Sequence, residues 1–337
     1  MTRTLRIWLS VLSLAAVVGL VAALPYIVGV NWDGVRGVLG ELSAGVLAGL
    51  VVLWLAGLGA YTFVLTASLP RLTHLRAFIL NAAGSAVSNV LPLGGAAGVA
   101  VTYGMCRSWG HRPYAIMVST LVTGVWNVLA RLLLPALGIA ALLVAHEVPD
   151  RRLAVTAGAA GAGLLAVAGL LVLVLRSAPA ATWTREVLLR LADRLPRLPA
   201  QATRRVAGSL PRVRHATIDV LRGGWPRLTF GMIGYLVLQA ALLVACLGAV
   251  GAAGIGLAET VAVFALNRAL TTAVVTPSGA GVSEMGTAAL LVHFGAPAAP
   301  AAAAVVLYMF FTYAVEIPLG GLAGGLWTLT RRRRAMP

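Results

Sequence analysis

Six apolar stretches are each long enough to cross a membrane as a helix, and they constrain the fold more than any other feature of the sequence. The hydrocarbon layer is about 30 Å thick and an α-helix rises about 1.5 Å per residue, so about 20 residues suffice. The stretches cover residues 7–30, 42–67, 114–145, 153–175, 228–250 and 301–329. We therefore expect an all-α polytopic membrane protein with six full transmembrane helices.

The composition fits a membrane protein and argues against a soluble one. Of the 337 residues, 60% are hydrophobic and 11% are charged, whereas a soluble domain has about 25% charged residues. A net charge of +16 would suggest nucleic-acid binding in a soluble protein, but here the arginines lie between apolar stretches. That distribution is typical of membrane orientation, so we expect anionic lipid headgroups, and not nucleic acid, as partners.

Two further apolar regions, residues 77–106 and 258–294, are interrupted by proline and glycine. Within them, FILNAAGSAVSNVLPLGGAAGV (78–99) and FALNRALTTAVVTPSGAGVSE (264–284) share the order Phe-x-x-Asn, a run of small apolar residues, Pro-x-Gly and Gly-Val. Each region fits either one broken helix or a hairpin of two half-helices that enters and leaves by the same face.

The distribution of arginine favours two re-entrant hairpins. With a cytoplasmic N-terminus, hairpins place the polar segment 176–227 and the run 331–334 inside and leave only Arg36, Arg151 and Arg152 outside. Single crossings would put the arginine-rich segment outside, against the positive-inside rule. Because three spans separate the hairpins, the hairpins enter from opposite faces. The sequence therefore predicts inverted repeats, a recurring plan of secondary transporters, with both termini cytoplasmic.

Residues 176–227 form the one sizeable polar segment, which we expect to be a cytoplasmic loop. Trp183 and the apolar residues that follow at helical spacing have basic residues between them, such as Arg185 and Arg190. This pattern predicts an amphipathic helix that lies on an anionic leaflet. The alternative is a solvated connector whose arginines only enforce the topology.

Four charged residues lie well inside the apolar regions, away from their ends: Arg131, Arg268, Glu284 and Glu316. A charge at the centre of a membrane helix costs roughly 2.5–3.5 kcal/mol on insertion scales, so these residues are candidates for a substrate-binding site. Two of them, Arg131 and Glu316, each lie in the first span after a hairpin, so they occupy corresponding places in the two halves. The alternative is that Arg131 pairs with Glu316, or Arg268 with Glu284, in permanent ion pairs that contact no substrate.

Polar and small residues of the two repeats complete the candidate substrate-binding site: Asn81, Asn267, Gly94, Gly95, Gly279 and Gly281. Arg268 directly follows Asn267, and a guanidinium matches a phosphate by bidentate hydrogen bonds. The glycines can present backbone N–H groups to an anion at half-helix N-termini. The alternatives are helix breaking and close packing for the glycines, and hydrogen bonds between helices for the asparagines.

The sequence indicates no metal, nucleotide or redox cofactor. The five histidines show no metal-ligand spacing; they are His74, His111, His146, His215 and His293. A P-loop and a dinucleotide fingerprint are both absent from the sequence. We therefore expect a protein that works without a cofactor.

The sequence PSGAGVSE at 277–284 resembles the Pro-x-Gly-x-Gly-x-x-Glu signature of the membrane region of lysylphosphatidylglycerol synthases. LPLGGAAGVA at 91–100 and YGMCRSWGHRP at 103–113 resemble the first motif of the same family. The resemblance implies a lipid translocase-like membrane domain, which in full synthases moves aminoacylated phosphatidylglycerol between leaflets. Only the arginine run follows the last apolar stretch, so we expect no aminoacyl-transfer domain and no synthesis of the lipid.

These features together predict a flippase or transporter of the bacterial plasma membrane, and not an enzyme, that moves an anionic or glycosylated phospholipid. A different hypothesis is a non-transporting scaffold or accessory subunit that binds cell-envelope biosynthesis enzymes through the basic loop. A third, a membrane enzyme acting on lipid-linked sugars, is disfavoured because no motif contains paired carboxylates or a histidine cluster. The lipid, the energy source, the direction of transport and the formation of a homo-oligomer stay open.

Overall fold

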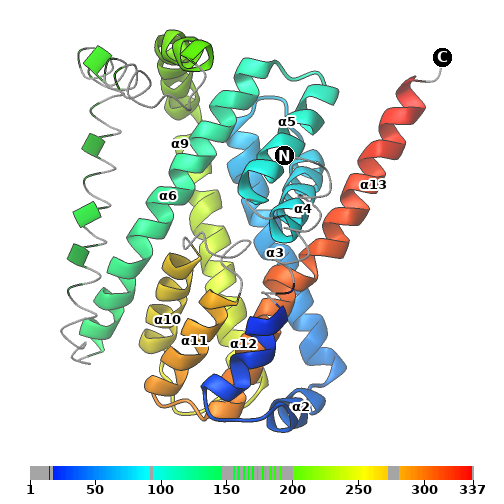
Figure 1. Cartoon of the computed structure of the whole chain (residues 1–337), viewed down its shortest axis with the longest axis vertical. Helices are drawn as coiled ribbons and strands as arrows, with labels where there is room; N and C mark the ends of the chain where they lie inside the picture. Colours follow the sequence, from blue (N-terminus) through cyan, green and yellow to red (C-terminus); the bar gives the residue numbers. More distant parts are fainter. Residues whose placement is uncertain are drawn as a thin grey trace.

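The protein is mostly helical in the residues that the structure, a computed structural model, describes. These are residues 18–91, 94–145, 200–271 and 281–335, with residue 15 and isolated positions between 155 and 190. They contain no strand. Figure 1 shows most of the long helices running along the long axis of the molecule. The prediction of an all-α protein is confirmed for this part of the chain, and its cause is that a helix satisfies its own backbone hydrogen bonds in lipid.

Four helical segments among the described residues are long and apolar enough to span a membrane. They are α3 (Ala44–Ser68), α6 (Pro113–Val144), the part His215–Ala249 of α9 (Ala200–Ala249), and Ala298–Arg331. The last segment joins α12 (Ala298–Met309), the π-helical turn η2 (Phe310–Ala314) and α13 (Glu316–Ala335). Four of the six predicted spans therefore have a helix at the expected place.

The two remaining predicted spans are described only in part. Helix Val18–Ile27, within the predicted span 7–30, is bent by 94° against α2 (Trp32–Gly40), and together the two are apolar enough to count as a fifth candidate span. The predicted span 153–175 lies outside the described residues except for isolated positions, which are helical. Six full spans thus remain a prediction.

Helix α9 begins much earlier than the predicted span 228–250. It runs without a break from Ala200 through Pro211 and Pro226 to Ala249. The second half of the segment 176–227 is therefore helical and continuous with the span, while its cytoplasmic location stays a prediction. Proline removes one backbone hydrogen bond but need not end a helix whose neighbouring turns are held in place. Next to Pro226, the fully buried Leu228 supplies such packing in a cluster with Val64 of α3.

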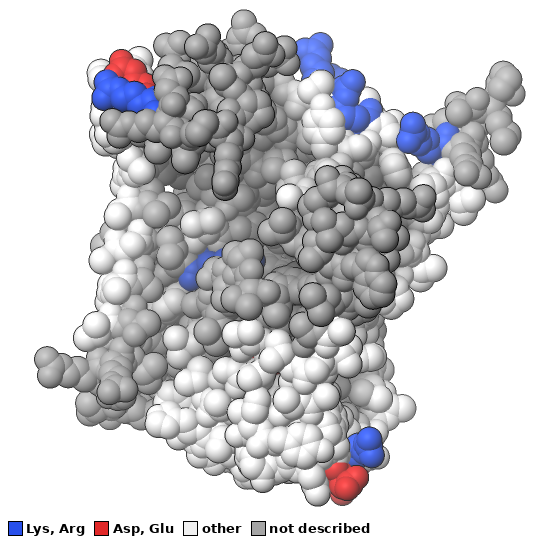
Figure 2. All heavy atoms as spheres, in the orientation of Figure 1, with Lys and Arg blue, Asp and Glu red and all other residues white. Residues whose placement is uncertain are grey.

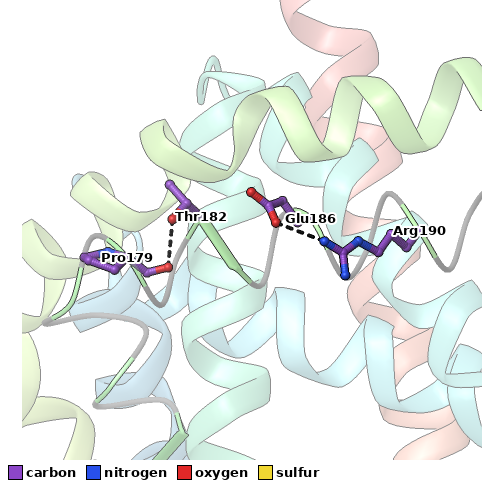
Figure 3. Close-up of polar contacts among 4 residues, drawn as sticks. All are labelled: Pro179, Thr182, Glu186 and Arg190. Carbon is purple, nitrogen blue, oxygen red and sulfur yellow. Dashed lines mark hydrogen bonds and ion pairs between the residues drawn. The ribbon is translucent and has the colours of Figure 1, made fainter.

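The first half of the same segment shows helical spacing at the few positions described. The Thr182 hydroxyl donates a hydrogen bond of 2.7 Å to the Pro179 carbonyl oxygen, and Arg190 forms a salt bridge of 3.4 Å with Glu186 (Figure 3). These separations of three and four residues correspond to one helical turn. Trp183 is exposed. The rest of the predicted amphipathic helix, including Arg185, lies outside the described residues.

Two helix pairs take the place of the interrupted regions. Helix α4 (His74–Val90) packs on α5 (Gly94–Ser108), and α10 (Leu257–Leu270) packs on α11 (Val282–His293). In Figure 1 the first pair lies in the upper half of the molecule and the second in the lower half. The pairs therefore belong to opposite ends of the molecule, as inverted repeats require.

Each helix pair packs against the long helix that follows the other pair. Helix α6 crosses α10 so closely that a Cβ atom at Gly138 would lie 3.0 Å from the Cα of Ala262. Helix α13 crosses α4 more closely still, because a Cβ atom at Gly320 would overlap the carbonyl oxygen of Ala82. Small residues let helix backbones approach in this way. The two halves are thus joined by reciprocal contacts.

Helix α12 forms the centre of the lower half. Ala301, Ala302, Ala303 and Ala304 are all fully buried, and the helix packs against α2, α9 and α11. Four consecutive buried positions are possible because every side of the helix faces protein and alanine occupies little space. The turn η2 follows directly and brings Glu316 to the middle of the molecule.

Candidate functional site

A cavity of about 430 Å³ lies where the two helix pairs meet the long helices. Its lining includes most of the residues predicted for the site: Asn81, Gly95, Arg131, Asn267, Arg268, Glu284 and Glu316. Gly94 and Gly281 are not part of the lining, and Gly279 lies outside the described residues. The fold therefore brings all four charged residues of the apolar regions to one cavity.

The surface of the molecule in Figure 2 has charged ends and a mostly uncharged middle. In Figure 2 most of the charged side chains of the described residues lie towards the two ends of the molecule. At mid-height, where white and grey atoms dominate, one basic surface is visible in a recess. On this face, the charge visible at mid-height is thus confined to that recess.

The Arg268 side chain has only part of its hydrogen-bonding capacity satisfied. Its Nη2 donates to the Tyr308 hydroxyl at 3.2 Å, and the guanidinium carbon lies 5.3 Å from the centre of the Phe264 ring. Its Nε is buried and has no hydrogen-bond partner among the described residues. An unsatisfied buried donor costs roughly 1–3 kcal/mol, so this atom can gain a partner when an anion enters the cavity.

Arg131 reaches the same cavity from helix α6, above a layer of neutral polar groups. One turn earlier, Asn127 donates hydrogen bonds of 2.9 Å to the Tyr61 hydroxyl and 2.8 Å to the Thr123 carbonyl oxygen. Two arginines that line one cavity repel each other, and an anion between them would remove that repulsion. Arg131 and Arg268 together therefore make one part of the cavity suited to a phosphate.

The two carboxylates receive hydrogen bonds from neutral donors. Glu316 accepts one of 3.5 Å from the side-chain amide of Asn89. Glu284 accepts one of 2.9 Å from the Ser283 hydroxyl and another from the backbone N–H of Gly281. Both carboxylates are buried. They are held in place without a basic partner.

Neither of the ion pairs considered from the sequence is present. The salt bridges among the described residues join surface neighbours, Arg36 with Asp33 at 3.6 Å and Arg190 with Glu186 at 3.4 Å. Arg268, Glu284 and Glu316 instead form hydrogen bonds with hydroxyl and amide groups, and Arg131 lines the same cavity. The alternative of permanent ion pairs is therefore wrong for this part of the chain, because neutral donors and the cavity itself take the place of the opposite charge.

The membrane region of lysylphosphatidylglycerol synthases matches residues 8–320 of the chain. The chain belongs to this family. The match includes both helix pairs and all four charged residues of the cavity, so the resemblance inferred from the two motifs is confirmed. A search of curated proteins finds no match.

In this family member the two asparagines of the repeats differ in their surroundings. The Asn267 side-chain amide donates hydrogen bonds of 2.8 Å to the Thr287 hydroxyl and 3.4 Å to the Ser283 carbonyl oxygen. These bonds tie α10 to α11, which is the structural alternative weighed for asparagine. Asn81 lines the cavity and remains a candidate contact for a ligand.

The glycines of this family member serve packing at some positions and the cavity at others. A Cβ atom at Gly94 would overlap the backbone of Ser88, and one at Gly281 would overlap Leu20. Gly281 also needs its φ of +88°, and its N–H donates to the Glu284 carboxylate, so in this arrangement the N–H is not available to a bound anion. Gly95 has no atom within 4 Å of a Cβ position, so it leaves space in the cavity.

Several polar residues of the cavity were missed from the sequence. Tyr308 donates a hydrogen bond of 3.3 Å to Gln239 and accepts the one from Arg268, and the Tyr313 hydroxyl donates one of 2.6 Å to the Asn89 carbonyl oxygen. Gln239 and Asn89 could have been found by the rule that identified the charges, since uncharged amides are also costly within apolar helices. The tyrosines carry no such signal, because tyrosine is common at membrane interfaces.

Proposed function

We propose that this protein is a lipid flippase or transporter, and that an anionic or glycosylated phospholipid headgroup passes through the central cavity. The observation that carries the proposal is the cavity of about 430 Å³ with four charged side chains that do not pair with one another. Its volume lies within the range of roughly 300–1,000 Å³ of typical ligand pockets. Ionisable groups within membrane helices mark substrate pathways by default, because they are too costly to keep without a use.

Different residues of the cavity would bind different parts of such a headgroup. Arg268, with its free Nε, and Arg131 would bind the phosphate, and Asn81 and the nearby hydroxyl groups would replace water around the polar part. Glu284 and Glu316 would balance the charge or exchange protons. The acyl chains stay in the bilayer, so the protein needs few polar residues. No covalent chemistry is required, which makes the protein a transporter and not an enzyme.

The proposed topology has six transmembrane helices and two re-entrant hairpins, with both termini in the cytoplasm of a bacterial cell. Three features support it: the helix pairs belong to opposite ends of the molecule, each pair packs on the other half, and the arginines are unevenly distributed. The first turn of α4, which contains Arg76, and the connection between α5 and α6, which contains Arg112, lie at the same end of the molecule as the end of α13. Under the positive-inside rule that end is cytoplasmic.

Lipid scrambling in liposomes tests the proposal. The protein is reconstituted with a trace of fluorescent phosphatidylglycerol, and a membrane-impermeant quencher reports the fraction of label that reaches the outer leaflet. We expect faster equilibration than in protein-free liposomes, and loss of at least tenfold in rate for the double variant Arg131→Met, Arg268→Met.

The matched control is Arg36→Met, which removes an exposed arginine of α2 far from the cavity and should scramble normally. Equal rates for the double variant and the control would refute the assignment of the cavity. A folded protein that scrambles no anionic or glycosylated lipid would refute the transport function and favour the hypothesis of a scaffold for cell-envelope biosynthesis enzymes.

A further inference from the structure

A second pocket, of about 230 Å³, lies at the arginine-rich end of the molecule, between the first helix pair and α13. It shares no lining residue with the central cavity. Two arginines and two tryptophans dominate its lining: Arg76, Arg331, Trp109 and Trp327. The described residues that line it include no acidic side chain, so the pocket is positively charged.

Each arginine of this pocket lies over a tryptophan ring. The guanidinium carbon of Arg76 is 5.5 Å from the centre of the Trp109 ring, and that of Arg331 is 5.9 Å from the centre of the Trp327 ring. A cation over an indole face is attracted to it by roughly 0.5–1 kcal/mol at an exposed site. The contacts fix the two arginines on either side of the pocket and leave their N–H donors free for an anion.

The pocket also has an apolar side and sits where a leaflet would end. Leu75 is 70% exposed and Leu326 is 57% exposed, and both line the pocket. Arg331 is the last residue of the candidate span Ala298–Arg331. Tryptophan and arginine at the end of a membrane span are typical of the interface between headgroups and acyl chains.

We propose that this pocket binds one anionic phospholipid of the surrounding leaflet, as a resident lipid and not as transported cargo. Its phosphate lies between Arg76 and Arg331, and the first methylene groups of an acyl chain lie against Leu75 and Leu326. Basic pockets between membrane helices favour anionic headgroups in this way.

The bound lipid would join the first helix pair to α13. The Trp327 indole N–H already donates a hydrogen bond of 2.8 Å to the Ser108 hydroxyl at the end of α5, and α13 packs along α4. A ligand that contacts both elements adds to this interface only when the protein is folded. Binding should therefore raise the thermal stability of the protein.

The test is thermal unfolding of the full chain in a neutral detergent, titrated with phosphatidylglycerol or with phosphatidylcholine. We expect phosphatidylglycerol alone to raise the melting temperature. Each of Arg76→Gln and Arg331→Gln should weaken the apparent affinity for phosphatidylglycerol about fivefold. This is the effect expected from the loss of one basic residue near an anionic lipid surface. Arg112→Gln, an exposed arginine at the same end and outside the pocket, is the matched control and should bind normally.

Further measurements distinguish binding in this pocket from binding in the cavity, and binding of a whole lipid from binding of its headgroup alone. The stabilisation should persist in Arg268→Met, which removes the phosphate ligand of the cavity, and in Arg76→Lys, which keeps the charge if the glutamine variant folds poorly. Equal stabilisation by phosphatidylcholine or by free glycerophosphate would overturn the proposal. Unchanged affinity in the double variant Arg76→Gln, Arg331→Gln would also overturn the proposal. That result would leave the proposed transport function of the cavity standing.

Discussion

Replacement of Arg268 by methionine should leave the protein at least as stable as before while it abolishes lipid transport. The substitution removes one hydrogen bond of 3.2 Å to Tyr308, worth roughly 0.5–1.5 kcal/mol. It also removes the buried Nε that has no partner among the described residues, a penalty of roughly 1–3 kcal/mol. Methionine fills a similar volume without a charge. The central values, a relieved penalty of about 2 kcal/mol and a lost bond of about 1 kcal/mol, leave a net gain of about 1 kcal/mol.

The adjacent residue Asn267 should behave in the opposite way. In Asn267→Ala the hydrogen bonds to Thr287 and to the Ser283 carbonyl oxygen are lost. Polar contacts between membrane helices are worth about 0.6–1.7 kcal/mol. The Thr287 hydroxyl keeps its own bond of 2.6 Å to the Ser283 carbonyl oxygen, which limits the loss to about 1–2 kcal/mol. Transport per folded molecule should change little.

Thermal unfolding and scrambling measured on the same preparations distinguish the two roles. A change of 1 kcal/mol corresponds to about 2–4 °C in melting temperature for a domain of 150–250 residues, and to somewhat less in a longer chain. We expect Arg268→Met to melt at or above the temperature of the unmodified protein and Asn267→Ala to melt below it. If Arg268→Met melts lower than Asn267→Ala and still scrambles lipid, Arg268 is a structural residue and the division of roles is incorrect.

Three other substitutions test the packing and the charge environment. Gly320→Ala should cost about 1–3 kcal/mol or more, because its Cβ atom would overlap the backbone of α4, while the control Gly321→Ala, with no atom within 4 Å, should unfold at nearly the normal temperature. Gly95→Ala should fold normally but slow the scrambling of large headgroups, since its methyl group enters the cavity. Burial and, secondarily, the charge of Arg76 lower the pKa of His111 in the folded protein. The unfolded protein therefore takes up a proton first, at a pH of about 6.5. Stability should fall as the pH drops from that value through the lower pKa of the folded state. NMR titration of labelled histidine should show a higher His111 pKa in Arg76→Gln, and an unchanged pKa would contradict the assigned contribution of Arg76.

The parts of the fold that could be predicted are those that depend on membrane solvation. Spans α3 and α6 begin and end within two residues of the apolar stretches 42–67 and 114–145, because apolar length alone decides whether a helix can cross the hydrocarbon layer. The charged residues of the cavity were found for the same reason. Arg268 and Glu284 are too costly to face lipid, wherever the rest of the chain lies.

The parts that could not be predicted depend on contacts between distant segments. Asn89 meets Tyr313 and Glu316 more than 220 positions later in the chain, and no local pattern specifies that contact. Whether the interior charges form ion pairs could not be decided from the sequence for a related reason. Opposite charges in matching places of two repeats indicate a shared cavity, but neutral donors nearby decide whether the charges meet. Helix α9 extends beyond its apolar stretch because packing on α3 continues past the point where hydropathy ends.

The reciprocal packing of the two halves bears on how a headgroup could pass between them. Helix α4 is held to α13 by the close approach at Gly320, and α10 is held to α6 by the one at Gly138. Each of these two contacts therefore joins a helix from one half of the sequence to a helix from the other half. Glu316 lies in the α4–α13 pair, while Arg131 and Arg268 lie in the α6–α10 pair. A movement of the α4–α13 pair against the α6–α10 pair would therefore change the distance from Glu316 to the two arginines. An anionic headgroup, which favours the arginines, would then shift the balance between the two arrangements.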